Sequence, residues 1–381
     1  MPKILEIHAL QTLGPNNINR DDTGAPKTAP FGGVTRSRVS SQCWKHAIRN
    51  TMKETLGSIK LSTRTQQVGS HLVQLLTERG VQNPEEIAEM LVKESGIVKE
   101  RQKNNSRSSK KQETTEEESA TNFMATDALL LMGNKVYEAL ADKGVEASNS
   151  EDLKAWIKDN STELKSIPLN DKAVDIALFG RMNTSNPALD IDAACQFAHA
   201  IGVSKAELDA DFYTAVDEIK VDSNGAGMMG DIEFASATLY RYASVNVTEF
   251  AKGLDDTDAT VEALNAFVKA FITTVPTGKI NSFANSTLPE LVIITLRDDQ
   301  PINLVGAFEQ PVTGNIPLNA AIALAKQERN FENVYGLKPT HTWTVGFPEL
   351  AEQVAPVFGP AVSLSEMQQN LSTILKEQPT A

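Results

Sequence analysis

A long segment with helical periodicity, residues 61–178, stands between an N-terminal strand pattern and a second set of strand patterns. Apolar residues in it recur at the spacing of amphipathic helices. We expect these helices over residues 66–79, 84–96, 123–143 and 151–164. Strands on both sides of such a segment favour one shared sheet. This order of strand and helix patterns therefore predicts an α+β fold in which a helical region is inserted into a sheet.

Alternating apolar residues mark the strands on either side of this insertion. Residues 3–12 predict the first strand, and residues 234–247 predict a later one. Between them we expect a hairpin, with its first arm at 212–219, a turn at 222–227 and a second arm that starts near Met228. The remaining expected elements are helices at 188–201, 257–275 and 318–331 and a strand at 291–297.

The charge of the chain is unevenly distributed. The net charge is -13, yet the first sixty residues carry nine Lys or Arg and only four acids. Such asymmetry indicates a local anion site on an acidic body, although chance clustering on a solvated surface explains it equally well. No apolar run is long enough to span a membrane, and the first residues lack a signal-peptide pattern. With two cysteines and no CxxC pair, we expect a soluble cytoplasmic protein without a disulfide framework.

The most informative local feature is the basic segment 31–49. The glycine pair at 32–33 permits positive φ and close backbone approach. Arg36 and Arg38 alternate on an extended stretch, so both fall on one side. The helix that opens at Ser40-Ser41 directs its free N–H groups the same way. Further donors follow along one helix face: Gln42, Lys45, Arg49 and Lys53. This line of donors suits a phosphate chain, and a solvated helix face is the equal alternative.

Three other motifs need an interpretation. Residues 225–230 match GxGxxG, but their flanks predict a hairpin tip and not the helix that a dinucleotide site requires. The acidic pair Asp21-Asp22 either holds a divalent ion or stabilises a turn. Residues 99–122 contain almost no apolar side chains, with a basic half and an acidic half, and predict a mobile loop. Neither GxSxG nor HExxH occurs, so no nucleophile–base set is visible.

Several segments resemble a known family, and they appear in the family's order. They are residues 19–22, 31–33, 36–45, 179–185, 198–200, 212–217, 233–243 and 275–279. In content and order they resemble the backbone subunit of the type I-E CRISPR Cascade complex, the CasC family. The N-terminal run is the specific part, and the last hundred residues are only loosely similar. Cys43, Trp44 and His46 depart from the family's pattern.

The resemblance implies a right-hand architecture. A ferredoxin-like (RRM-like) palm would comprise residues 1–60 and 238–381 together with 180–205. Helical fingers would span 61–179, and a β-hairpin thumb would span 206–237. The palm does not carry the usual RNA-recognition aromatics, and Tyr240 and Tyr242 are read as core residues.

The resemblance also implies which residues contact RNA. Ser40, Gln42, Lys45 and Arg49 match the family's phosphate contacts, and Arg20 lies in the matching loop. Met182 matches a wedge, and from the residues alone a core plug is the alternative for this apolar side chain. Phe212 and Thr214, with Tyr213 between them, would lie beside a displaced base. A holder that does not read sequence uses backbone charge and stacking groups in this way.

The function implied is non-catalytic, without cofactor or metal. Copies of the chain would polymerise along guide crRNA, displace bases at regular intervals and present the guide to target DNA, together with other Cascade subunits. The alternative is a metal-dependent RNA endonuclease subunit that uses Asp21 or Asp22. A nucleotide-dependent oxidoreductase or kinase that relies on the GxGxxG match is a weaker interpretation.

Overall fold

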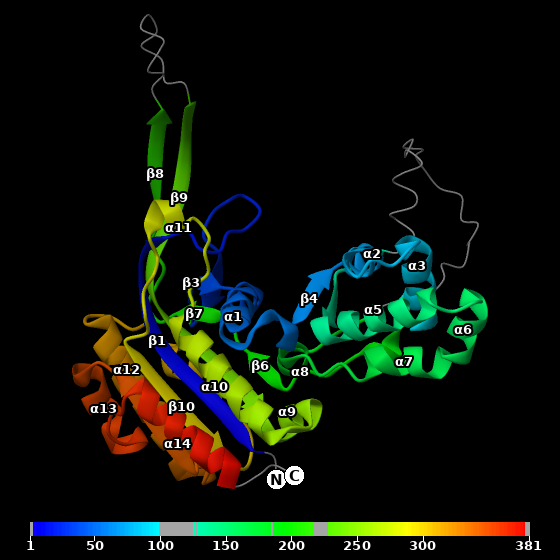
Figure 1. Ribbon diagram of the computed structural model, residues 1–381. Coiled ribbons are helices and arrows are strands. Elements are labelled where there is room, and N and C mark those ends of the chain that lie inside the picture. The colour runs from blue at the N-terminus through cyan, green and yellow to red at the C-terminus, as the bar shows by residue number, and fades with distance from the viewer. Residues whose placement is uncertain (1–2, 99–124, 127, 184–185, 216–227, 378–381) are drawn as a thin grey trace, which may run out of the picture. The chain divides into compact units, whose positions relative to one another are not determined.

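The computed structural model describes residues 3–98, 125–126, 128–183, 186–215 and 228–377 (Figure 1). The chain divides into two compact units. Unit 1 contains Met1–Met52 and Cys195–Ala381, and unit 2 contains Lys53–Ala194. The expected loop at 99–122 and the expected hairpin turn at 222–227 lie outside the described residues.

Unit 1 is built on an antiparallel sheet that draws strands from both ends of the chain. Across the described residues the strand order is β11-β10-β1-β9-β7-β3-β2, and β6 and β8 also pair with β9. The strands are β1 (Ile4–Asn16), β2 (Thr28–Phe31), β3 (Val34–Val39), β6 (Cys195–Phe197), β7 (Ala200–Gly202), β8 (Leu208–Ala215), β9 (Met228–Asn246), β10 (Leu291–Arg297) and β11 (His341–Gly346). A mixed α+β protein with one sheet built from both chain ends confirms the predicted class.

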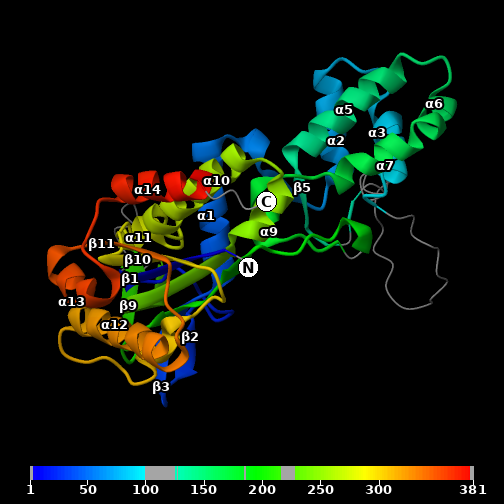
Figure 2. The same cartoon turned by 90° about the horizontal axis from the view of Figure 1, so that it is seen from below.

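Helices cover both faces of this sheet (Figure 2). They are α1 (Ser41–Leu56), α9 (Val247–Leu254), α10 (Thr257–Thr273), α11 (Ile280–Phe283), α12 (Ile316–Tyr335), α13 (Pro348–Phe358) and α14 (Leu364–Glu377), with a short η3 (Leu304–Phe308). The Arg241 guanidinium lies over the rings of Trp44 in α1 and Phe271 in α10, which places these two helices on one face. Tyr240 and Tyr242 point to the other face, where they pack with α12 and α13 and confirm the core interpretation.

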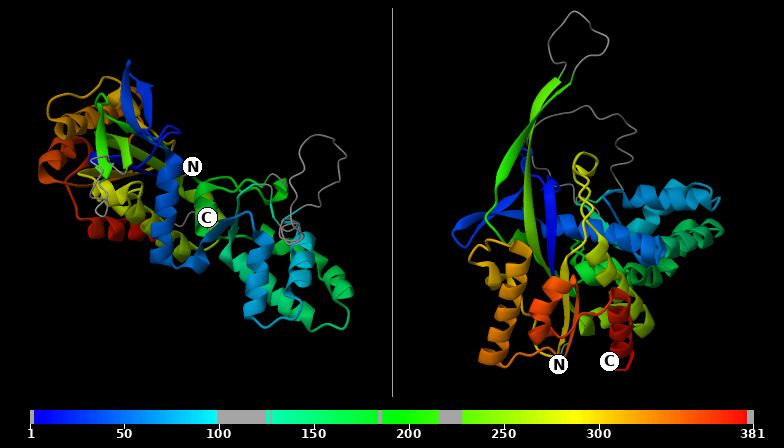
Figure 3. Two further views of the ribbon diagram at one scale, coloured as in Figure 1. Left: turned by 90° about the horizontal axis from the view of Figure 1, so that it is seen from above. Right: turned by 90° about the vertical axis from the view of Figure 1, so that its left-hand side faces the viewer.

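β9 extends past the end of β1, its neighbour in the sheet. Its later part, from Ala235 on, pairs with β1, whereas residues 228–234 pair only with β8. This two-stranded arm extends beyond the rest of the sheet of unit 1 (Figure 3). Phe283 of α11 packs against Phe234 at the base of the arm, with ring centroids 6.0 Å apart. We call residues 208–215 and 228–235 the β8–β9 arm.

Unit 2 is mostly helical and has its own core. Its elements are η1 (Ser58–Lys60), β4 (Ser62–Thr65), α2 (Val68–Glu78), α3 (Pro84–Glu94), β5 (Leu130–Gly133), α5 (Asn134–Ser148), α6 (Leu153–Asp159), α7 (Ser161–Leu169), α8 (Val174–Phe179) and η2 (Pro187–Leu189). Buried leucines of α2, α3 and α5 form the centre of this core. Within the described ranges of both units, no helix combines the length and apolar content needed to cross a bilayer.

Two expected helices are corrected by the structure. The helix expected at 188–201 is instead the short η2 followed by β6 and β7, because this segment satisfies its backbone by pairing with β9. In the stretch 123–143 the helix begins only at Asn134. The residues just before it form β5, which pairs with β4. In both places pairing with a distant strand outweighs the local periodicity.

Candidate nucleic-acid interface

The start of α1 is fixed by hydrogen bonds from neighbouring loops. The Ser40 amide donates to Asn19 Oδ1 at 2.8 Å, and the Cys43 amide donates to Ser40 Oγ at 3.3 Å, the geometry of a helix N-cap. Trp44 is fully buried and holds the helix against the sheet. Gln42 remains exposed and Lys45 half-exposed. Ser40 therefore positions the helix, while Gln42 and Lys45 lie at its surface.

Arg36 does not face the same environment as Arg38, contrary to the expectation from the sequence. Its side chain is fully buried, and its guanidinium donates to five backbone carbonyls, those of Phe31, Gly202, Val203, Phe308 and Glu309. A guanidinium has five N–H groups, so every donor is used. Arg36 thus ties β3 to the segment after η3 and has no donor left for an RNA phosphate.

The glycine pair before Arg36 also has a structural explanation. Gly32 and Gly33 have φ of 60° and 79° and form the two-residue turn between β2 and β3. A Cβ on Gly32 would lie 1.5 Å from the Glu309 carbonyl oxygen, so only glycine fits. The sequence predicted positive φ and a close backbone approach at these two glycines. Both are present, and the backbone that lies close to Gly32 is that of Glu309.

Arg38 belongs to a group of basic side chains beside the start of α1. Its Nε donates to the Thr28 carbonyl at 3.2 Å, and its Nη1 lies 3.2 Å from His199 Nδ1. The charges of Arg38, Lys27 and Lys45 all act on the His199 ring and lower its pKa, after the larger effect of burial. We call Lys27, Arg38, Lys45 and His199 the α1 basic cluster. Two elements, β3 and α1, and two loops thus contribute positive or polar groups to one place, the arrangement that binds phosphate.

Two further predicted contacts lie near this cluster in the sequence but differ in exposure. Arg20 is exposed in the loop 18–24, which surrounds an open hollow of about 510 Å³. Arg49, one turn beyond Lys45, is only 8% exposed. The uniform basic stripe expected along α1 is therefore interrupted after Lys45.

Asp21 stabilises a turn in that loop. Its Oδ1 accepts from the Thr23 amide at 2.9 Å, the Thr23 hydroxyl at 2.7 Å and the Ala25 amide at 3.1 Å, and these donors lower its pKa. This is the local hydrogen bonding typical of a turn aspartate. In the part of the chain that the structure describes, no three His, Cys, Asp or Glu side chains gather as a metal site would require.

Met182, in unit 2, lies at the surface between two buried residues. Arg181 is buried, with its Nη1 2.5 Å from Asp171 Oδ2, and the Asn183 amide donates to Asp190 Oδ1 at 2.6 Å. These contacts anchor the chain on both sides, whereas the Met182 side chain is 77% exposed. The reading of Met182 as a core plug is therefore excluded, and an exposed apolar side chain remains.

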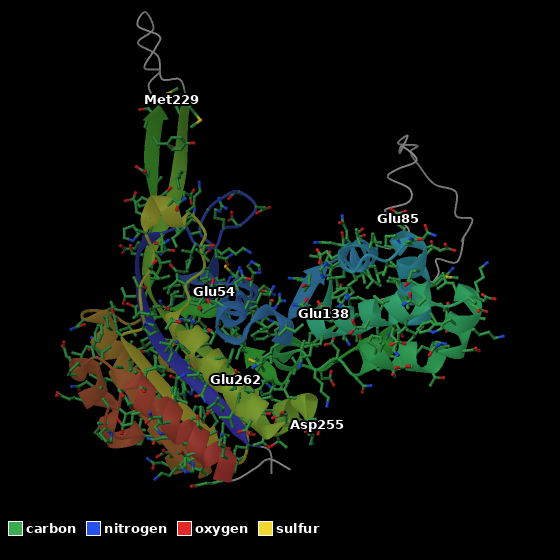
Figure 4. The ribbon with its side chains drawn as sticks, in the orientation of Figure 1. Glu54, Glu85, Glu138, Met229, Asp255 and Glu262 are labelled. Carbon is green, nitrogen blue, oxygen red and sulfur yellow. The ribbon has the colours of Figure 1, made fainter. Side chains whose placement is uncertain are left out.

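The β8–β9 arm carries the last two predicted contacts. Phe212 is 62% exposed and pairs in register with Asp231, and Thr214 is exposed opposite Met229. Figure 4 shows Met229 at the far end of the arm. Tyr213 lies over Gly230, where a Cβ would meet the Tyr213 hydroxyl at 2.6 Å. The last glycine of the GxGxxG match is thus a strand glycine under a tyrosine ring, and no helix follows it before Asn246.

Comparison with known proteins shows the family to which the chain belongs. The sequence profile of one Cas family, described as CT1975-like protein, matches residues 5–370. The chain belongs to the CT1975-like family of Cas proteins. A solved chain entitled "CRISPR RNA-guided surveillance complex, pre-nicking" is 31% identical, with a TM-score of 0.78, over 97% of this chain and 100% of that one.

A second solved chain, entitled "CRISPR RNA-guided surveillance complex", is 26% identical with a TM-score of 0.61. It covers 96% of this chain and 99% of its own length. No curated protein matches the sequence. The two solved chains thus match this one over nearly their whole length.

Two members of the α1 basic cluster are not among the contact residues that the sequence predicts. The sequence predicts a helix over residues 188–201, which include His199, yet His199 is exposed in the connection between β6 and β7. Lys27 stands out in the sequence only as one of the nine N-terminal cations. Neither shows a local signal, because both reach the cluster through pairing of strands that are far apart in sequence.

Proposed function

We propose that this chain is the backbone subunit of a type I-E Cascade complex, of the CasC family, and that it binds guide crRNA. Its full-length likeness to chains of RNA-guided surveillance complexes supports a Cascade-like role. The observation that carries the RNA-binding part is the α1 basic cluster, which concentrates cations on a chain of net charge -13. A local positive site of this kind holds a phosphate backbone without reading bases.

The fold supports a ferredoxin-like palm. In the order β10-β1-β9-β7 the strands, numbered along the chain, read 4-1-3-2, with α1 after the first and α10 after the third. This is the arrangement of a βαββαβ unit. On this proposal the palm comprises residues 1–60, 180–205 and 238–381, most of which lie in unit 1, whereas residues 53–60 and 180–194 lie in unit 2. The fingers are residues 61–179, and the thumb is the hairpin 206–237.

The proposal also assigns a role to the exposed apolar side chains, namely contact with guide bases. Met182 and Phe212 are both largely exposed although both are apolar. Exposed side chains of this type stack on or wedge between bases of any sequence. We assign Met182, Phe212 and Thr214 to the displacement of guide bases at regular intervals. Arg20, Ser40, Gln42, Lys45 and Arg49 remain in the proposed RNA site with Arg38, whereas Arg36 does not.

The proposed role is that of a non-catalytic scaffold. Asp21 is occupied as a turn acceptor, which fits a structural role for the acidic pair. Further copies of the chain, other Cascade subunits and target DNA are the proposed partners besides crRNA.

The salt dependence of RNA binding tests the phosphate site. We expect Arg38→Ala with Lys45→Ala to weaken binding of single-stranded RNA of any sequence. The slope of log affinity against log salt should fall by about 0.7 for each phosphate group that the variant no longer neutralises. The matched control is Lys326→Ala with Lys338→Ala, which removes two charges on and after α12. An equal effect of both pairs, or weakening limited to some sequences, would contradict the site.

A further inference from the structure

The ring of His199 occupies a position where an anion would bind. Its Nδ1 lies 3.2 Å from Arg38 Nη1 and 3.3 Å from the Ser41 amide nitrogen. Guanidinium and amide groups only donate hydrogen bonds, so Nδ1 must accept and the ring proton must be on Nε2. The neutral imidazole thus supplies the acceptor for two donors at the start of α1.

The surroundings of His199 keep the ring uncharged. Partial burial of the ring lowers its pKa, and the positive charges of Arg38 on β3, Lys27 before β2 and Lys45 on α1 lower it further. At neutral pH the ring is therefore neutral and the hydrogen bonds from Arg38 and Ser41 are retained. An anion placed among the same three cations would reverse this balance, since its negative charge stabilises the imidazolium.

We propose that His199 couples phosphate binding at the α1 basic cluster to the uptake of a proton. In the free chain the Nδ1 lone pair accepts from Arg38 and from the Ser41 amide. When a phosphate group binds, one proton from solvent adds to Nδ1, which can then no longer accept. The guanidinium and the amide become available to phosphate oxygens, and the imidazolium becomes a third donor to them. This inference rests on the proposed function, in which the phosphate belongs to RNA.

The proposal predicts a pH-dependent affinity with a definite sign. Binding takes up a proton in the pH range between the lower pKa of the free chain and the higher pKa of the complex. Within that range the affinity falls as pH rises, by at most roughly tenfold per pH unit for one proton. Outside that range the contribution of His199 is constant.

The test measures binding of a single-stranded oligouridylate at constant salt from pH 5.5 to 8.5. We expect His199→Gln to bind RNA with a flat pH profile, because glutamine keeps an acceptor but does not titrate. The matched control is His46→Gln, which removes another exposed histidine, this one on α1, whose Nε2 lies 3.5 Å from Asn50 Nδ2. This control should retain the wild-type slope. A slope that persists in His199→Gln, or that disappears only in His46→Gln, would overturn the role of His199.

A direct measurement separates this inference from the proposed function. NMR titration of the histidine rings, with the His199 signal identified by its absence in His199→Gln, should show a higher pKa when oligouridylate is bound. An unchanged pKa with RNA bound overturns only the proton coupling. RNA binding that is unaffected by Arg38→Ala with Lys45→Ala overturns the proposed phosphate site, and this inference with it.

Discussion

At the scale of single residues, Met182 provides the sharpest test of the wedge. A buried methionine changed to alanine costs ~2–5 kcal/mol of folding free energy, but this side chain is 77% exposed. We therefore expect Met182→Ala to melt near the wild-type temperature. In assembled complexes the loss should be ~1–3 kcal/mol for each base contacted, by analogy with stacking platforms. Chemical probing should then show weaker protection of the displaced guide nucleotides.

The isolated variant provides the control for this prediction. Suppose that Met182→Ala melts at a much lower temperature than the wild type while its complexes give the wild-type probing pattern. Met182 would then stabilise the fold and would not act as a wedge. Leu169→Ala is a matched substitution, because Leu169 is another exposed apolar residue of unit 2. It should change neither the melting temperature nor the probing pattern.

Substitution of the acidic pair Asp21-Asp22 tests the proposal that the subunit does not cleave RNA. Asp21→Asn with Asp22→Asn keeps an oxygen acceptor at each position, so the turn formed with Thr23 and Ala25 should persist. We expect target RNA to remain uncut by the wild-type complex in the presence of divalent metal, and by the variant likewise. Regularly spaced cuts that the variant abolishes would instead support the endonuclease alternative.

The sequence predicted the location of the basic site better than the role of each residue in it. Arg36 and Arg38 lie on the same strand and have the same side chain, yet one donates to five carbonyls in the core and the other lies beside His199. Their difference depends on η3 and β7, which are distant in the chain. Local spacing cannot reveal such contacts. The turn glycines could be predicted, because positive φ is a property of the residue itself.

At the scale of elements, a buried polar network joins β1 to β10 and α12. Arg297 Nε lies 2.5 Å from Glu6 Oε2, and Arg297 Nη2 lies 2.6 Å from Glu328 Oε1. Next to this network His8 is fully buried, with its Nδ1 2.9 Å from the Tyr240 hydroxyl. Burial lowers the pKa of His8 to about 4, with a smaller opposing effect of Glu6.

This histidine predicts how stability depends on pH. Between pH 6.5 and about 4 the unfolded chain binds a proton at His8 that the folded chain does not, so stability falls as pH decreases. Relative to His8→Asn, the wild type should lose about 1.4 kcal/mol per pH unit across this window. Chemical denaturation at a series of pH values measures it. The half-exposed His341 gives the control: if His341→Asn changes the profile as much as His8→Asn does, the assignment to His8 fails.

The sequence predicted the positions of elements that have strong hydrophobic periodicity or a helix cap. It did not predict short strands that form by pairing with a strand distant in the chain. The strand at 291–297 and the helix from 257 match β10 and α10, where Asp256 caps the helix by accepting from the Ala259 amide. By contrast, the segment 188–201 has helical spacing but pairs with β9. Short strands that depend on a long partner carry little local signal.

At the scale of the whole molecule, the distribution of charge makes the proposed RNA binding compatible with an acidic chain. The chain as a whole carries a net charge of -13, whereas the α1 basic cluster concentrates positive charge at the start of one helix. Screening limits repulsion from distant acids to about 8–10 Å at ordinary salt, so the local cations determine the contact. The discontinuous sheet was predictable because strand patterns flank the helical insertion. The length of the β8–β9 arm was not, because residues 228–234 pair only with β8.

The most direct test of the central claim is the composition of the complex that forms in cells. The chain should be co-expressed with a CRISPR transcript and the other Cascade subunits, purified, and weighed intact by native mass spectrometry. The account predicts several copies of the chain on one RNA, with more copies when the guide is lengthened, and fewer for Arg38→Ala with Lys45→Ala. An RNA-free protein, or one copy per RNA whatever the guide length, would contradict it.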